Sequence, residues 1–200
     1  MEIRKATHQD LESIMAIYAY ARDYMMKTGN PNQWKDNHPS QSVVETDIQS
    51  GRSYVCIHKG IIAAVFYFNV EEDSTYSRID GKWLNNEPYG VVHRIARGAN
   101  VKGAGAYALK WCMQQHPNVR IDTHKDNAPM LKLLDNLGFV YCGIIWLENG
   151  DERLAFQSQT QIQGGCPITM CRVLGMEGHS LSQNRCSPYQ GEVVRLRPGI

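Results

Sequence analysis

Residues 91–107 read VVHRIARGANVKGAGAY, and this stretch decides the fold that the sequence predicts. An apolar run typical of a β-strand passes into a glycine-containing loop, and the loop opens an amphipathic helix predicted over 105–116. The first N–H groups of a helix lack acceptors within it, and the helix dipole adds partial positive charge there. Glycines let a ligand approach the backbone closely. The stretch therefore predicts an anion-binding turn, most often for a phosphate, with a plain glycine-rich turn as the alternative.

The segments on either side predict a mixed sheet. The predicted strands are 2–6, 53–58, 61–70, 91–96, 119–123, 139–147 and 153–157, and the predicted helices are 11–28, 42–50, 105–116 and 127–137. Lys59-Gly60 and Asn149-Gly150 indicate tight hairpin turns, while segment 71–90 is polar and irregular. One right-handed βαβ crossover over 91–123 then lies between antiparallel hairpins. The predicted fold class is α/β, with a sheet of mixed α+β type.

A dinucleotide-binding fold is the first alternative for the phosphate loop. Residues 103–108 match the pattern G-x-G-x-x-A, and Asp122 ends the following strand. In that fold, however, the first glycine follows its strand almost directly, whereas residues 97–102 intervene here. It also needs several parallel crossovers, and this sequence predicts one. A dinucleotide-dependent enzyme is therefore the weaker alternative.

Three motifs resemble the GCN5-related N-acetyltransferases (GNAT), which move acetyl from acetyl-CoA to an amine. Residues 3–11, IRKATHQDL, resemble a common start of that family. Lys102-Gly103-Ala104-Gly105 stands where the family has R/Q-G-x-G, and Asn127 with Leu137-Gly138-Phe139 resembles its Asn-headed helix closing on Gly-Phe. The resemblance covers residues 3–157 and implies a GNAT-like acyl-CoA N-acyltransferase fold over a domain 1–157.

The resemblance also implies a reaction and a set of binding residues. Acetyl-CoA is the expected cosubstrate, and a neutral amine attacks its thioester directly. The backbone of Ile95, Ala96 and Arg97 would hold the acetyl group and the pantetheine arm, and Asn127 would lie beside that arm. The amides of Lys102, Gly103, Ala104, Gly105, Ala106 and Tyr107 would bind the pyrophosphate. A fixed N–H donor at the carbonyl suits the negative charge that develops there.

Two positions depart from the family pattern. Tyr107 is bulkier than the glycine or alanine usual there. Leu134 replaces the tyrosine that often protonates the departing CoA thiolate. A thiol with a pKa of about 8.5 is itself a good leaving group. A non-catalytic acyl-CoA-binding protein of the same fold is the alternative that Leu134 motivates.

The base that accepts the amine proton is predicted among two histidines. His93 lies on the strand that enters the site, and His124 ends the next strand. An imidazole suits proton transfer near pH 7, although a hydrogen-bonded structural histidine is the alternative at each position.

The acceptor is predicted to be a primary amine of a small molecule or peptide. The first helix and segment 71–90 would border its pocket, and Trp34, Trp83 and Tyr89 would line or pack it. The acids of that segment fit a cationic amine, and a solvated acidic loop explains them as well.

Composition narrows the class of protein further. A net charge of +1 argues against nucleic-acid binding. No apolar run approaches the ~20 residues of a membrane span, and the charged N-terminus predicts no secretion signal and a cytoplasmic location. The oligomeric state stays open, with a homodimer as one alternative.

The cysteines and the end of the chain predict neither a disulfide scaffold nor a metal site. The six cysteines are scattered, and Cys56, Cys112 and Cys142 lie in apolar or amphipathic segments, where buried, unreactive thiols are expected. Residues 158–200 read as a mobile or loosely packed tail. The spacing of Cys166, Cys171, His179 and Cys186 fits none of the usual zinc patterns, so no metal is predicted.

Overall fold

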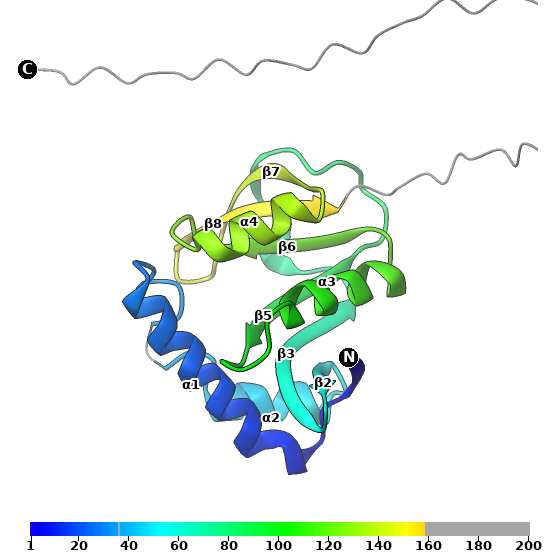
Figure 1. The fold of residues 1–200 in the computed structure, drawn as a ribbon. Coiled ribbons are helices and arrows are strands. Elements are labelled where there is room, and N and C mark those ends of the chain that lie inside the picture. Colours follow the sequence, from blue (N-terminus) through cyan, green and yellow to red (C-terminus); the bar gives the residue numbers. More distant parts are fainter. Residues whose placement is uncertain (36, 159–200) are drawn as a thin grey trace, which may run out of the picture. The chain divides into compact units, whose positions relative to one another are not determined.

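The computed structural model describes residues 1–35 and 37–158 (Figure 1). They form an eight-stranded sheet in the order β1-β2-β3-β5-β6-β8-β7-β4, antiparallel except for the parallel pair β5 and β6. The strands are β1 Glu2–Lys5, β2 Ser53–His58, β3 Ile61–Val70, β4 Ile79–Gly81, β5 Gly90–Arg97, β6 Val119–Thr123, β7 Phe139–Trp146 and β8 Glu152–Ser158. The helices are α1 Leu11–Lys27, α2 Gln41–Gln49, α3 Ala104–Gln115 and α4 Ala128–Asn136, with short 3-10 turns at His8–Asp10 and Ser74–Tyr76.

The helices cover both faces of the sheet because side chains alternate along the central strands. Val65 of β3 packs with Ile14 of α1 and Val44 of α2. The next residue, Phe66, faces the opposite side, where it packs with Leu109 of α3 in the cluster that also includes Leu134 of α4. The predicted mixed sheet with a single parallel crossover is confirmed, and one parallel pair does not make a dinucleotide-binding sheet.

The parallel strands β5 and β6 separate part-way along their length. They pair only from Gly90 to Val92 against Val119 to Ile121. Beyond that point β5 stays with β3, and β6 stays with β8. The rest of β5 therefore has main-chain groups on its β6 side without a ladder partner, and a ligand can use them.

Strand β4 was not predicted, because it has three residues inside the polar segment 71–90. It pairs with β7, and Gly81 lies opposite Gly143, with φ of +137° and +143°. A β-carbon on either glycine would collide with backbone of the other strand. The contact therefore requires glycine at both positions.

The prediction for the three cysteines within the sheet and helices is confirmed. Cys56, Cys112 and Cys142 are free and buried, as predicted.

Strand β8 continues through Ser158, one residue beyond the predicted domain boundary. The Ser158 hydroxyl donates to the Pro117 carbonyl at 2.7 Å and accepts from the Val119 amide at 2.8 Å. Residues 159–200, with Cys166, Cys171, His179 and Cys186, lie outside the described residues.

None of the helices described here is long and apolar enough to cross a membrane. No group of three potential metal ligands occurs within residues 1–35 and 37–158.

Candidate active site

Strand β5 carries a bulge where the sheet opens. Its register with β3 shifts between Val65 and Tyr67, and Arg94 opposite has a φ of +50°. The Arg94 guanidinium donates two 2.9 Å hydrogen bonds to the Asp47 carboxylate, and the Tyr18 hydroxyl donates to the Arg94 carbonyl at 3.0 Å. The side chain and the main chain together hold this uncommon backbone conformation, which redirects the neighbouring residues of the strand.

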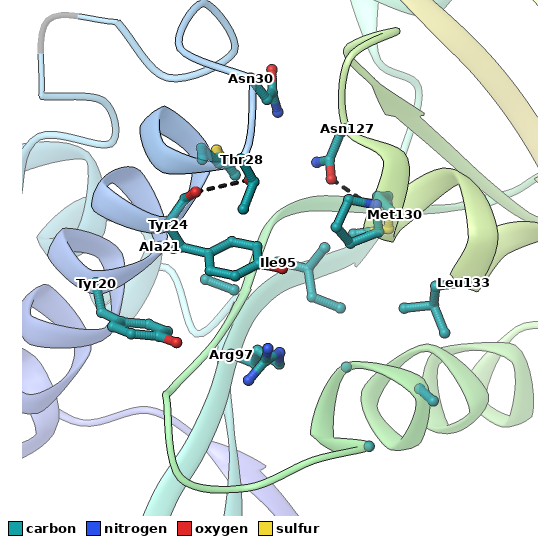
Figure 2. A pocket seen from close by; sticks show the side chains of 16 residues that line it. Tyr20, Ala21, Tyr24, Thr28, Asn30, Ile95, Arg97, Asn127, Met130 and Leu133 are labelled. Atoms are coloured by element: carbon teal, nitrogen blue, oxygen red, sulfur yellow. Dashed lines mark hydrogen bonds between the residues drawn. The ribbon is translucent and has the colours of Figure 1, made fainter.

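The first cavity, of about 250 Å³, lies between α1, β5 and the first turns of α3 and α4 (Figure 2). Its walls are mostly apolar, with Ile95, Met130 and Leu133 facing Tyr24 of α1. The predicted cofactor-binding residues that line it are Ile95, Ala96, Arg97, Gly103, Gly105, Ala106 and Asn127. Residues far apart in the sequence therefore share one cavity.

The start of α3 supplies free main-chain donors to this cavity. Gly103 is the N-cap residue with a φ of +80° and offers no side-chain cap. The Tyr107 amide donates to the Gly103 carbonyl at 3.0 Å, so the helical bonding begins there. The preceding amides, those of residues 104–106, have no acceptor within the helix. Helix α3 begins at the predicted loop, which suits an anion.

Three predicted residues contribute differently from the expectation. Lys102 is exposed and Ala104 is buried among small residues, and neither lines the cavity. The Tyr107 hydroxyl donates to the Met1 carbonyl at 2.6 Å, so its ring reaches toward the N-terminus. Because the Tyr107 amide is used within the helix, it is not a free donor for a phosphate. The prediction that the Tyr107 amide binds the pyrophosphate is therefore corrected.

Asn127 has both a structural and a lining role. Its side-chain oxygen accepts from the Met130 amide at 3.2 Å and caps α4. Its Nδ2 donates to Gln33 Oε1 at 2.8 Å, and Asn30 Nδ2 donates to the same oxygen at 2.7 Å. Gln33 thus ties the loop after α1 to the head of α4. Gln33 and Asn30 were not predicted as site residues, because no local motif marks them.

A second cavity, of about 640 Å³, also includes Ile95 in its wall. Its lining is richer in charged groups than that of the first cavity. The wall includes His93 and Arg94 of β5, together with Asp73 and Asp122. The other charged wall residues are Lys35, Glu148, Asp151 and Arg153. Ile95 therefore separates an apolar cavity beside main-chain donors from a cavity lined by ionisable side chains.

His93 lies between two carboxylates in the second cavity. Its Nε2 is 2.6 Å from Asp73 Oδ2, and its Nδ1 is 3.8 Å from Asp122 Oδ1. Burial alone would raise the pKa of Asp73, but the hydrogen bonds from His93 and Thr75 outweigh it and lower that pKa to about 2. The Tyr76 hydroxyl donates to Asp122 Oδ1 at 2.9 Å. Neither Asp73 nor Asp122 was predicted as a partner of His93.

The structure separates the two predicted histidines. His124 lines a third cavity with Lys125 and Leu154, not the cavity of His93. Its Nδ1 is 3.4 Å from Asp126 Oδ2, and desolvation by burial lowers its pKa. Strand β6 ends at Thr123, so side-chain alternation does not carry His124 to the face that Asp122 occupies. His124 therefore does not line the cavity of His93, although the two cavities share Lys35, Asp151 and Arg153 in their walls.

The three aromatic residues predicted to line or pack the acceptor pocket lie in two different environments. Trp34 lines the second cavity. Trp83 is buried, and the Arg120 guanidinium carbon lies 4.2 Å from the centroid of its ring and 3.8 Å from that of Tyr89. Trp83 and Tyr89 therefore pack the segment rather than line the cavity. The first helix, α1, lines the first cavity and not the second.

Leu134 is completely buried in the core cluster that α3 and α4 share. Its neighbour Leu133 faces the first cavity, together with Pro129 and Met130 of the same helix. The described residues therefore place no acid at this position of α4.

An acetyltransferase of the GNAT family from Streptococcus agalactiae is 33% identical over 78% of this chain and 94% of its own, with a TM-score of 0.72. The chain belongs to the GNAT family of acetyltransferases. The sequence matches no protein-family profile and no curated protein.

More distant GNAT folds share the architecture. A ribosomal-protein-alanine N-acetyltransferase from Brucella melitensis is 18% identical, covering 79% of this chain and 99% of its own, with a TM-score of 0.54. The Salmonella typhimurium protein yncA, whose structure includes its cofactor acetyl-CoA, is 15% identical over 80% and 94%, with a TM-score of 0.55. At these identities the likeness extends to the fold alone. It agrees with the predicted GNAT-like fold of this acetyltransferase.

Proposed function

We propose that this GNAT protein transfers acetyl from acetyl-CoA to a primary amine of a small molecule or peptide. One observation carries the proposal: the apolar cavity at the head of α3 and the charged cavity of His93 share Ile95 as a wall residue. A thioester held beside Ile95 could thus be reached by an amine from the second cavity. Direct transfer between two ligands needs such neighbouring sites.

The first cavity suits CoA by its chemistry. Amides at the start of α3, those of Gly105 and Ala106, would bind the pyrophosphate, since both residues line the cavity. The unpaired edge of β5 at Ile95, Ala96 and Arg97 would hydrogen-bond the pantetheine arm and the thioester carbonyl, and the apolar walls would enclose the arm. Acetyl-CoA supplies the electrophilic thioester carbonyl.

His93 is the proposed base in the second cavity. It would accept a proton from the amine, whose lone pair then forms the new C–N bond as the C–S bond breaks. The thiolate of CoA leaves without a protein acid at position 134, since it is stable near neutral pH. We do not assign the base role to His124, because it does not line the cavity that includes Ile95 and His93.

A turnover assay tests this function. Purified protein is incubated with acetyl-CoA and a panel of primary amines, and release of free thiol is followed. We expect thiol release above the hydrolysis background and binding of acetyl-CoA by calorimetry. Binding without turnover on any amine would favour the non-catalytic acyl-CoA-binding alternative, and a thermal shift with NAD but not with CoA would favour the dinucleotide alternative.

We also propose that the catalytic domain comprises residues 1–158. Both cavities are lined by residues up to Arg153, and Ser158 closes β8 onto the start of β6. The cytoplasmic location stays a prediction.

A further inference from the structure

We propose that Asp73 fixes the tautomer of His93, and that His93 Nδ1 and the Asp122 carboxylate together form a receptor for the substrate as a protonated primary amine. This inference rests on the proposed function and deepens it. It names the ionic form in which the acceptor binds, the nitrogen that takes its proton, and the residue that orients that nitrogen.

The orientation of Asp73 is fixed by a backbone amide, which can only donate. Its Oδ1 accepts from the Thr75 backbone amide at 2.8 Å and from the Thr75 hydroxyl at 2.5 Å. Its other oxygen, Oδ2, lies 2.6 Å from His93 Nε2. Because an ionised carboxylate only accepts, His93 Nε2 must carry the hydrogen. The carboxylate thereby selects one tautomer of neutral His93.

The other nitrogen of His93 is then a lone-pair acceptor. Within residues 1–35 and 37–158 no hydrogen bond to Nδ1 is formed, and the nearest carboxylate oxygen, Asp122 Oδ1, is 3.8 Å away. The rings of Tyr67 and Tyr76 lie 5.7 and 6.0 Å from the imidazole ring, centroid to centroid. The imidazole is packed between them, and its side chain keeps 22% exposure in the cavity.

Asp122 is held in place without being neutralised. The Tyr76 hydroxyl donates to its Oδ1 at 2.9 Å. Burial, followed by the charge of Asp122, raises the pKa of Tyr76, so the hydroxyl stays a donor. No Lys or Arg among the described residues forms an ion pair with Asp122. The Asp122 carboxylate, 13% exposed, therefore lies 3.8 Å from His93 Nδ1 without a cationic Lys or Arg bound to it among the described residues.

The charges around this pair favour a cation. Asp73 and Asp122 flank His93, while Arg94 beside it is bound to Asp47. The cations across the cavity, Lys35 and Arg153, lie 3.7 and 3.8 Å from the Asp151 carboxylate. An ammonium group has three donors and one positive charge, which match Asp122 and Nδ1 together. A carboxylate or phosphate at this point would be repelled.

The proposed reaction accounts for both amine protons and for the electron pairs of the C–N and C–S bonds. The bound ammonium gives one proton to His93 Nδ1 and becomes a neutral amine, and the imidazole becomes a cation stabilised by Asp73 and Asp122. The amine lone pair forms the C–N bond to the thioester carbonyl carbon, and the C–S electrons leave with sulfur. The second proton on the new amide nitrogen passes to the thiolate or to water, and His93 returns its proton to water.

The decisive variant is Asp73→Asn. The Thr75 amide still requires an acceptor, so the asparagine oxygen takes the place of Oδ1 and its NH2 group faces His93. That NH2 group donates to Nε2, which must then hold the lone pair, and the hydrogen moves to Nδ1. We expect kcat to fall between about 10² and 10⁴-fold, as when a wrong histidine tautomer is imposed elsewhere, with a much smaller change in KM for the amine.

Nitrogen NMR of the full chain reads the tautomer directly, because a protonated ring nitrogen and a lone-pair nitrogen differ strongly in chemical shift. The His93 signals are identified by their loss in His93→Gln. Wild type should show hydrogen on Nε2, and Asp73→Asn should show it on Nδ1. A merely structural role of Asp73 would not reverse the two nitrogens.

Asp122→Asn separates binding from orientation. It keeps the size of the side chain and an acceptor for Tyr76 but removes the negative charge. We expect KM for the amine to rise at least 10-fold, with the wild-type tautomer retained. Asp80→Asn is the matched control, because Asp80 is an exposed carboxylate on strand β4 and lines none of the cavities described above.

The outcomes distinguish this inference from the proposed function. Failure of wild type to acetylate any amine overturns the proposed function, while the NMR still tests the tautomer. A wild-type signal with hydrogen on Nδ1, or an Asp73→Asn variant with unchanged kcat, overturns the role of Asp73. An unchanged KM in Asp122→Asn overturns the ammonium receptor.

Discussion

The two cavities are built in different ways. The wall of the first consists largely of main chain and apolar side chains at the head of α3, along β5 and on α1 and α4. The wall of the second includes ionisable side chains from several distant segments, held by one another. A ligand common to a whole family can be bound by backbone geometry, whereas a particular acceptor has to be recognised by side chains.

Gly105→Glu should have the largest effect and should fall on the first cavity alone. A β-carbon at this position would meet only Leu133, at an ordinary contact distance of 3.6 Å, so the fold accommodates the change. The carboxylate would stand at the amides proposed to bind the pyrophosphate. We expect calorimetry to show at least a 100-fold loss of acetyl-CoA affinity, equivalent to about 2.7 kcal/mol.

Two controls sharpen this prediction. Gln114→Glu adds the same charge at the exposed far end of α3 and should bind acetyl-CoA like wild type. The NMR signals of His93 should be unchanged in Gly105→Glu, because the second cavity is not touched. Affinity retained in Gly105→Glu would mean that the head of α3 is not the phosphate site.

Asp47→Ala should destabilise the bulge in β5, the strand that lines both cavities. It leaves the Arg94 guanidinium, 17% exposed, without its carboxylate, beside a bulge with positive φ. We expect about 2–3 kcal/mol of destabilisation in urea unfolding, together with weaker acetyl-CoA binding and slower turnover. Gln49→Ala, on the exposed side of α2, is the control. Equal stability of the two variants would show that the ion pair does not hold the bulge.

Truncation should have the smallest effect and should leave both cavities intact. A chain ending at Ser158 should bind acetyl-CoA like the full chain. A chain ending at Gln157 loses the hydroxyl that bridges Pro117 and Val119, and we expect it to be about 1–2 kcal/mol less stable in the same unfolding assay. A large loss of affinity in the longer truncation would place part of the site in residues 159–200.

The contrast between the cavities also explains how far the sequence could be interpreted. Strands Ser53–His58, Ile61–Val70 and Val119–Thr123 lie where alternation and turn residues predicted them. The head of α3 was predictable because glycine spacing and helix geometry are local properties. Strand β4 was missed because its pairing depends on Gly143, far away in the chain.

The second cavity could be predicted only in part. The strand position of His93 was visible, but its partners Asp73 and Asp122 come from other segments and meet it only through the fold. His124 looked equivalent to His93, since both lie on or beside central strands. Only the fold places His93 in one cavity with Asp73 and Asp122, and His124 in the wall of another cavity. No local sequence signal distinguishes the two histidines.

The single residue Ile95 between the two cavities has a consequence for inhibitor chemistry. A compound that joins CoA through a short acyl bridge to an amine would occupy both cavities in one molecule. Once the nucleotide end was anchored, the amine end would bind at a high effective concentration, so the conjugate should exceed either half in affinity. The bridge length that binds best would measure the separation between nucleophile and thioester in solution.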